Sequence, residues 1–231
     1  MLPAIVYENA DIIVADKPAG LPVHGTGEND KRDTLISFLV SHYPLLKDVG
    51  ENSIRPGIVH RLDKETSGLM VVAKNNETFY ELKKMFQERK IEKKYMALVS
   101  GTMERDEGII QSPIEKMGTK TVISRANSSN AAKIKQAITQ YKALKRFKEY
   151  TLVEVSPKTG RMHQIRVHFA SINHSIACDK LYGGKAKKCP AGLGRHFLHA
   201  YYLRFQLKNA LMEFEIDLPK DLKMALESLT I

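Results

Sequence analysis

The sequence has no tryptophan and only two cysteines among its 231 residues. Two cysteines cannot build the disulfide framework that stabilises small secreted proteins, and Cys178 and Cys189 do not form a CxxC pair. A zinc site that also uses His174 is conceivable, but the spacing of these residues supports it poorly. We therefore expect both cysteines to be reduced thiols in a cytoplasmic protein.

Long apolar runs are also lacking, since none approaches the roughly 20 residues that a membrane-spanning helix needs. The first residues carry neither the basic nor the apolar region of a secretion signal, so no membrane partner is expected. Acidic residues are in the minority, with 26 Asp and Glu against 36 Lys and Arg, which gives a net charge of +10. This excess favours an anionic partner, RNA or DNA before an acidic membrane, although charge alone does not distinguish these from mere solubility.

Apolar residues make up 43% of the chain, enough for a sizeable core. Their periodicity predicts a single α/β (α+β) domain over residues 1–231, with a mixed, largely antiparallel sheet flanked by helices and loops. Strands are expected at residues 5–7, 12–15, 69–73, 91–99, 137–144, 150–155 and 211–218. Helices are expected between Asp33 and Pro44, after Asn75 or Asn76, over residues 163–173 and around residues 222–229.

The periodic pattern fades between Gln111 and Lys135, where glycine and asparagine mix with lysine and arginine. This composition predicts a basic loop or an extended hairpin. Long loops in compact domains are often functional, but a solvent-exposed loop without a function can have the same composition, so both interpretations stay open. A second basic, glycine-containing excursion is expected over residues 183–195.

A dense polar cluster, His60-Arg61-Leu62-Asp63-Lys64-Glu65-Thr66-Ser67, runs through Gly68 directly into the apolar run at residues 69–73. Asp63 is closely flanked by the basic side chains of Arg61 and Lys64. Chemistry is commonly placed on a loop that leads into a rigid core strand. A polar loop before a strand is also an ordinary structural feature, so this cluster alone leaves the function open.

A second polar cluster, Gly160-Arg161-Met162-His163-Gln164-Ile165-Arg166-Val167-His168, opens the helix predicted at residues 163–173. Peptide N–H groups in the first turn of a helix favour an anion. Arg161 and Arg166 add fixed positive charge with a geometry suited to carboxylate or phosphate. The alternative is a structural helix whose histidines are satisfied in the core and whose arginines are solvated.

Together, the two clusters resemble the signature motifs of the RluA family of pseudouridine synthases. Further segments resemble the family in the same order, namely Asp16–His24, Lys94–Val99, Cys178–Gly183 and Leu198–Ala200. Met162, Asp16 and Gly25 depart from the usual Thr or Ser, Asn and Pro, which puts the substrate in doubt but not the reaction. The resemblance implies one catalytic domain without a separate N-terminal RNA-binding domain.

The resemblance implies three catalytic residues for the isomerisation of uridine in RNA. Asp63 would be the essential carboxylate, and Arg166 would be the counter-charge that keeps Asp63 ionised. Tyr95 would stack on the uracil and take part in proton transfer, although a tyrosine on a strand is also an ordinary core residue. The reaction needs no cofactor and no metal.

The resemblance also implies residues that hold the RNA. Arg61 would enter the stack when the target base leaves it, with a phosphate clamp as its alternative role. Arg161 and His163 are further candidates for RNA binding. The expected partner is a stem-loop of rRNA or tRNA, the specificity is expected in the basic loops at residues 116–135 and 183–195, and a monomer is favoured.

Two other classes of function compete with this hypothesis. A non-catalytic RNA-binding or RNA-folding protein on the same fold is disfavoured, because a pure binder has no need for the set Asp63, Tyr95 and Arg166. A nuclease or DNA-acting hydrolase is disfavoured because the sequence lacks the carboxylate clusters of two-metal chemistry.

Overall fold

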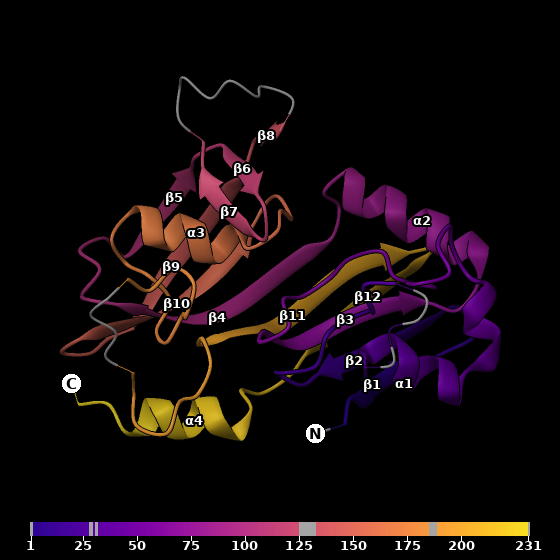
Figure 1. The fold of residues 1–231 in the computed structure, drawn as a ribbon, viewed down its shortest axis with the longest axis horizontal. Helices are drawn as coiled ribbons and strands as arrows, with labels where there is room; N and C mark the ends of the chain where they lie inside the picture. Colours follow the sequence, from indigo (N-terminus) through magenta and orange to yellow (C-terminus); the bar gives the residue numbers. More distant parts are fainter. Residues whose placement is uncertain (1, 28–29, 31, 125–132, 185–188, 231) are drawn as a thin grey trace. The chain divides into compact units, whose positions relative to one another are not determined.

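The structure, a computed structural model, describes residues 2–27, 30, 32–124, 133–184 and 189–230 (Figure 1). The chain forms two compact units. Unit 1 comprises Met1–Glu92 and Ala200–Ile216, and unit 2 comprises Lys93–His199 and Asp217–Ile231. The single catalytic domain over residues 1–231 stays a prediction.

Unit 1 is built on strands in the order β1-β2-β3-β11, with β12 paired to β11. The pairs β1–β2, β2–β3 and β11–β12 are antiparallel. These strands are β1 (Ala4–Glu8), β2 (Ile12–Lys17), β3 (Ser67–Ala73), β11 (Leu198–Leu207) and β12 (Ala210–Glu215). Its helices are α1 (Leu35–His42), the 3-10 helix Pro44–Asp48 and α2 (Asn76–Gln87). All residues of β3 are buried, so the strand that follows the first polar cluster is a core strand, as predicted.

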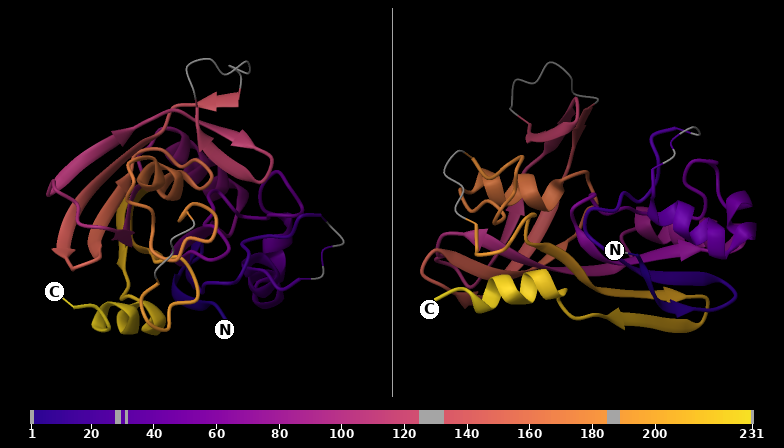
Figure 2. Two further views of the ribbon diagram at one scale, coloured as in Figure 1. Left: turned by 60° about the vertical axis from the view of Figure 1, so that its left-hand side comes forward. Right: turned by 60° about the horizontal axis from the view of Figure 1, so that its bottom comes forward.

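Unit 2 holds the antiparallel order β4-β10-β9-β5 and a separate three-stranded sheet in the order β7-β6-β8 (Figure 2). The strands are β4 (Glu92–Ser100), β5 (Glu107–Gln111), β6 (Ile114–Met117), β7 (Lys120–Ile123), β8 (Ile134–Lys135), β9 (Ile138–Arg146) and β10 (Tyr150–Pro157). Its helices are α3 (Gln164–Ser171) and α4 (Lys220–Glu227). Ile165 and Phe169 of α3 pack in one core cluster with Val99 of β4 and Val153 of β10.

The predicted α+β class with a mixed, largely antiparallel sheet is confirmed, and differences are local. The N-cap of α1 is Thr34 and not Asp33, because the Thr34 hydroxyl accepts from the amide of Ser37 while the Ser37 hydroxyl accepts from the amide of Thr34. Asn75 caps α2. The segment expected as a basic loop or hairpin carries three short strands, and residues 125–132 and 185–188 of the two basic loops lie outside the described residues.

The expectation of two reduced thiols is wrong in this structure, which joins Cys178 to Cys189 in a disulfide. Their Cα atoms lie 5.2 Å apart, across a sequence separation of 11 residues. The expectation rested on the cellular compartment and on the missing CxxC spacing, and neither reports how close two cysteines come in the folded chain. Among the described residues, no helix is long and apolar enough to cross a membrane.

Gly68, which links the first polar cluster to β3, is expected to tolerate no side chain. Its φ angle is +123°, and an added Cβ atom would lie 2.2 Å from the main-chain oxygen of Ala200 on β11. We therefore expect Gly68→Ala to lower the free energy of unfolding by about 3 kcal/mol or more, measured by urea denaturation.

Gly20→Ala is the matched control, because Gly20 has a φ angle of +84° but no atom within 4 Å of the added Cβ. Only backbone strain of about 1–2 kcal/mol is expected there. Equal destabilisation by the two substitutions would contradict the close approach of Gly68 to β11.

Candidate functional site

Asp63 lies in a tight turn shortly before β3. Its main-chain carbonyl accepts a hydrogen bond from the amide of Thr66 at 3.1 Å. Thr66 and the following Ser67 are buried, Asp63 is half-buried and Arg61 is exposed. The turn therefore fixes the main chain around the carboxylate, while the guanidinium of Arg61 remains accessible to a ligand.

A buried lysine ties this turn to the loop after β2. Lys17 is fully buried, and its ammonium group donates to the main-chain oxygens of Pro18 and Leu21 at 2.8 Å and of Lys64 at 3.1 Å. A buried charge is tolerated only when it is hydrogen-bonded, and here three carbonyl oxygens surround the ammonium. Lys17 thus holds the residue next to Asp63 in place. The sequence contained Lys17 in a candidate motif, but nothing in it showed this role.

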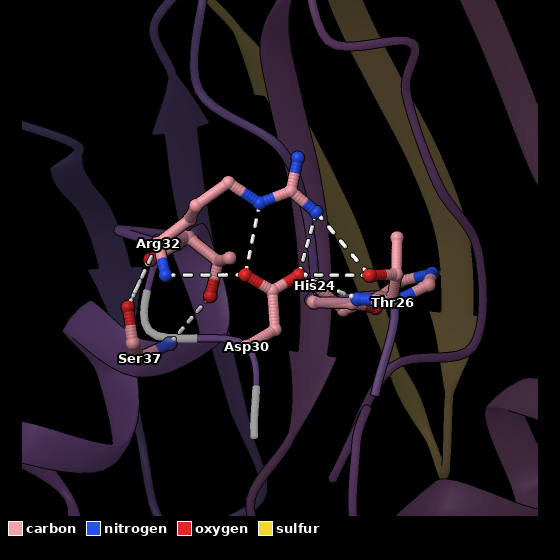
Figure 3. A network of polar contacts seen from close by, with 7 residues as sticks. His24, Thr26, Asp30, Arg32 and Ser37 are labelled. Carbon is pink, nitrogen blue, oxygen red and sulfur yellow. Dashed lines mark hydrogen bonds and ion pairs between the residues drawn. The ribbon is translucent and has the colours of Figure 1, made fainter. Parts of the chain in front are cut away.

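Described residues of the loop between β2 and α1 form an exposed polar network (Figure 3). The carboxylate of Asp30 accepts from Nε of Arg32 at 2.8 Å and from the amide of Thr26 at 2.8 Å. The hydrogen bonds of Arg32 hold the pKa of Asp30 well below its usual range. Nδ1 of His24 lies 2.6 Å from the main-chain oxygen of Gly25. Because exposed ion pairs contribute little to stability, these contacts are expected to add little to the free energy of unfolding.

In unit 2, Arg166 forms a buried two-point ion pair with Asp179. Nε of Arg166 lies 2.7 Å from Oδ2 of Asp179, and Nη2 lies 2.9 Å from Oδ1. Oδ1 also accepts from the amides of Leu181 and Tyr182, at 2.8 and 3.0 Å. Burial alone would raise the pKa of Asp179, but the hydrogen bonds and the charge of Arg166 outweigh it, and the pKa lies below its ordinary value. The pair therefore holds the guanidinium in a fixed orientation.

Tyr182 joins several parts of this site. The Cζ atom of Arg166 lies 5.1 Å from the centre of the Tyr182 ring, a cation–π distance. The Tyr182 hydroxyl lies 2.9 Å from Nδ1 of His163 and accepts from the amide of Thr121 at 3.0 Å. His163 is the N-cap of α3 and has a left-handed backbone, with φ at 55°. The structure thus brings His163 and Arg166 together. Asp179 and Tyr182 lie in the Cys178–Gly183 segment, but the sequence did not show their roles.

The turn before α3 is closed by Gln164. Its Oε1 accepts from the hydroxyl of Thr159 at 2.7 Å and from the amide of Arg161 at 3.1 Å, and its Nε2 donates to the main-chain oxygen of Ile138. Gln164 is buried, whereas Arg161 is exposed. In the second cluster, the guanidinium of Arg161 is therefore accessible to a ligand, whereas Gln164 stabilises the turn.

Two histidines of the clusters have structural partners. Nε2 of His60 accepts from the amide of Val71 at 3.0 Å, which places it against β3. His168 is fully buried, with Nδ1 at 2.9 Å from the hydroxyl of Thr139 and Nε2 at 3.1 Å from the main-chain oxygen of Ser112. Burial lowers the pKa of His168. The structural alternative considered for the second cluster therefore holds for this histidine.

Tyr95 lies on β4, opposite Val155 of β10, and packs against the core cluster of α3. It is half-buried. Lys93 lies two residues earlier, on the same side of the strand, and burial lowers its pKa. This side of β4 thus combines an aromatic ring with an ammonium group that sequence reasoning did not single out.

The candidate residues divide between the two units. Asp63 and Arg61 belong to unit 1. The other candidates belong to unit 2, namely Tyr95, Arg161, His163 and Arg166. The ion pair expected between Asp63 and Arg166 therefore stays a prediction. Among the described residues, no group of three or more His, Cys, Asp or Glu side chains could hold a metal ion.

Residues 11–171 match the family model described as RNA pseudouridylate synthase. The chain is 43% identical over 228 residues to an "Uncharacterized RNA pseudouridine synthase" of Aquifex aeolicus, covering 95% of this chain and 70% of that protein. It is 38% identical to the "Ribosomal large subunit pseudouridine synthase D" of Borreliella burgdorferi and of Vibrio cholerae, covering 94% of this chain in each comparison. The chain spans 65% and 68% of the length of these two relatives.

Two solved structures with similar folds also have titles that name an RNA pseudouridylate synthase domain. The structure titled "Human RNA Pseudouridylate Synthase Domain Containing 1" matches with a TM-score of 0.77 at 25% identity, covering 99% of this chain and 88% of that one. "Human RNA Pseudouridylate Synthase Domain Containing 4" matches with a TM-score of 0.75 at 26% identity, covering 99% and 94%.

Proposed function

The chain belongs to the RNA pseudouridylate synthase family, which makes it an RNA isomerase, and from this premise we propose that it converts uridine to pseudouridine in large-subunit ribosomal RNA, with Asp63 as the essential carboxylate. The observation that carries the proposal is the Asp63 cluster itself, held in a tight turn before a fully buried strand and inside the matched residues. Ribosomal RNA is favoured over tRNA because relatives over nearly the whole chain are named for the large ribosomal subunit. We expect a monomer that acts in the cytoplasm.

The reaction is an isomerisation, so it conserves every atom of the nucleotide. The bond between N1 of uracil and C1′ of the ribose breaks, the base rotates, and a bond between C5 and C1′ forms. C5 loses its proton and N1 gains one, which leaves no net oxidation or reduction. Cleavage builds positive charge on the sugar, and the Asp63 carboxylate would stabilise or trap that charge, as in retaining glycosidases.

Arg166 would supply the counter-charge that keeps the catalytic carboxylate ionised. Its two-point pair with Asp179 and its contact with the Tyr182 ring support this role, because a guanidinium fixed by its neighbours needs no reorganisation during the reaction. Tyr95 would stack on the uracil, and its hydroxyl would relay the proton that leaves C5.

Arg61, Arg161 and His163 would hold the RNA. Arg61 is exposed next to the Asp63 turn, where its side chain would fill the gap that the flipped uridine leaves. Arg161 is exposed at the turn before α3 and suits a phosphate. His163 would contribute from the N-cap of α3, where Tyr182 orients its ring.

Tritium release tests the proposed reaction directly. A large-subunit ribosomal RNA transcript labelled with [5-³H]uridine is incubated with the protein in EDTA, beside a labelled tRNA transcript. Because C5 loses its proton, we expect release from the ribosomal transcript, undiminished by the chelator. Retained RNA binding without release from either transcript would support the non-catalytic alternative and overturn the proposal.

A further inference from the structure

A pocket of about 500 Å³ lies in unit 2, apart from the Arg166–Asp179 pair. Its walls come from β6 and β7, from the start of β8, and from Arg161 and Met162 in the turn before α3. The volume lies within the range of sites that bind small molecules. Apart from Arg161, which is proposed to hold a phosphate, the residues of this pocket have no role in the proposed reaction.

The pocket is apolar inside and cationic at its edge. Ile114 and Met162 provide apolar walls, and Ile114 is buried. The exposed side chains of Lys116, Lys133, Lys135 and Arg161 also line it, against the single carboxylate of Glu115. A nucleotide has the complementary chemistry, because its base packs on apolar groups while its phosphates pair with cations.

Thr121 lines the pocket and carries a buried hydroxyl without a hydrogen-bond partner among the described residues. The residue is 3% exposed, and its hydroxyl has no hydrogen-bond partner in the described part of the chain. Buried hydroxyls are normally paired, and less than 1 Å² of this oxygen is accessible, so the polar edge of a ligand would pair with it only after the side chain turns toward the pocket. This feature distinguishes the pocket from a patch of surface lysines.

The pocket is also connected to the candidate active-site arginine. The amide of Thr121 donates to the hydroxyl of Tyr182 at 3.0 Å, and the ring of Tyr182 lies against Arg166. A ligand that orders Thr121 would therefore order the support of the guanidinium. Binding at the pocket and alignment of the reacting uridine would thus favour each other.

We propose that this pocket binds a second nucleotide of the RNA substrate, one that leaves its stack but is not itself isomerised. The base lies between Ile114 and Met162, and the adjoining phosphates meet Lys116 and Lys135. The polar edge of the base meets the Thr121 hydroxyl once that side chain has turned toward the pocket. The proposal rests on the proposed function, because the nucleotide belongs to the same RNA. It makes the pocket a determinant of which RNA is modified.

The first test separates the pocket from general basic charge. In tritium-release kinetics on the ribosomal RNA transcript, the double variant Lys116→Gln, Lys135→Gln is expected to raise KM about tenfold and to reduce the slope of log KM against log salt by about 1.5. Its kcat stays within about twofold of the wild type, since the reacting groups are untouched. Lys142→Gln, an exposed lysine of unit 2 outside the pocket, leaves both constants unchanged.

The second test observes the pocket without the reaction. The ¹³C-methyl resonance of Met162, assigned with Met162→Leu, is followed while AMP, GMP, CMP and UMP are added in separate titrations. At least one nucleotide is expected to shift it at millimolar concentration, and Thr121→Val, which keeps the side-chain shape, is expected to weaken that shift at least threefold.

The two tests fail separately from the proposed function. Normal tritium release by the wild type, together with an unchanged KM in the double lysine variant and no shift of the Met162 resonance, overturns the pocket and leaves the isomerase standing. Nucleotide shifts that depend on Thr121, in a protein that releases no tritium, support the pocket and overturn the proposed reaction.

Discussion

Replacing Asp63 by asparagine is expected to lower pseudouridine formation by at least about 10³-fold while leaving the affinity for RNA within a factor of about two. Asparagine has nearly the same shape, so the turn closed by the carbonyl of residue 63 and the amide of Thr66 is kept. An amide has no negative charge to stabilise the developing positive charge on the sugar, and it is a poor nucleophile. Tritium release measures the turnover, and filter binding measures the affinity.

Glu65→Gln is the matched control, because Glu65 is a second half-buried carboxylate of the same cluster, two residues away. Its turnover is expected to stay within about threefold of the wild type, since the chemistry is assigned to Asp63 alone. Turnover of the Asp63→Asn variant within tenfold of the wild type would exclude Asp63 as the essential carboxylate.

Replacing Arg166 by alanine is expected to have two effects, one on stability and one on catalysis. The substitution leaves the carboxylate of Asp179 buried without its guanidinium, and breaking a buried pair in this way costs about 3–5 kcal/mol of unfolding free energy. Turnover per folded molecule is expected to fall by about 10²-fold or more, because the counter-charge of the catalytic carboxylate is lost. Urea denaturation and tritium release measure the two effects on one preparation.

The double variant Arg166→Gln, Asp179→Asn separates these effects. Two amides replace the two charges, so no unpaired charge is buried, and much of the stability is expected to return. Turnover is expected to stay low, because the fixed positive charge is still missing. Arg195→Ala is the structural control, since Nε of Arg195 lies 2.7 Å from Asp221 in another arginine–aspartate pair; Asp221 is 44% exposed, so a smaller loss of stability and unchanged turnover are expected. Turnover that returns together with stability would show that Arg166 serves only the fold.

The fold was predictable because most helices and strands have a recognisable pattern of apolar and polar residues within their own segment of the sequence. Residues 69–73 of β3 form a continuous apolar run, and β9 and β10 alternate between apolar and polar residues, so each of these strands can be recognised from a few neighbouring residues. Helix ends were less certain. Thr34 and Asp33 are both good N-cap residues, and the choice depends on the partner that Ser37 provides.

The candidate site was predictable only where a motif or a single residue type carried the signal. Asp63 and Arg166 were proposed in that way, and their catalytic roles stay predictions. Lys17 and Asp179 were not, because their roles depend on partners that the folded chain brings to them: three main-chain oxygens for the ammonium, and a guanidinium 13 residues away for the carboxylate. The disulfide of Cys178 was missed for the same reason.

The most direct measurement of the central claim is a map of pseudouridine across ribosomal and transfer RNA from cells that lack this gene. The account predicts that one or a few positions of large-subunit ribosomal RNA lose their pseudouridine. It further predicts that the wild-type gene restores them and that the Asp63→Asn gene does not. An unchanged map, or restoration by the Asp63→Asn gene, would contradict the account.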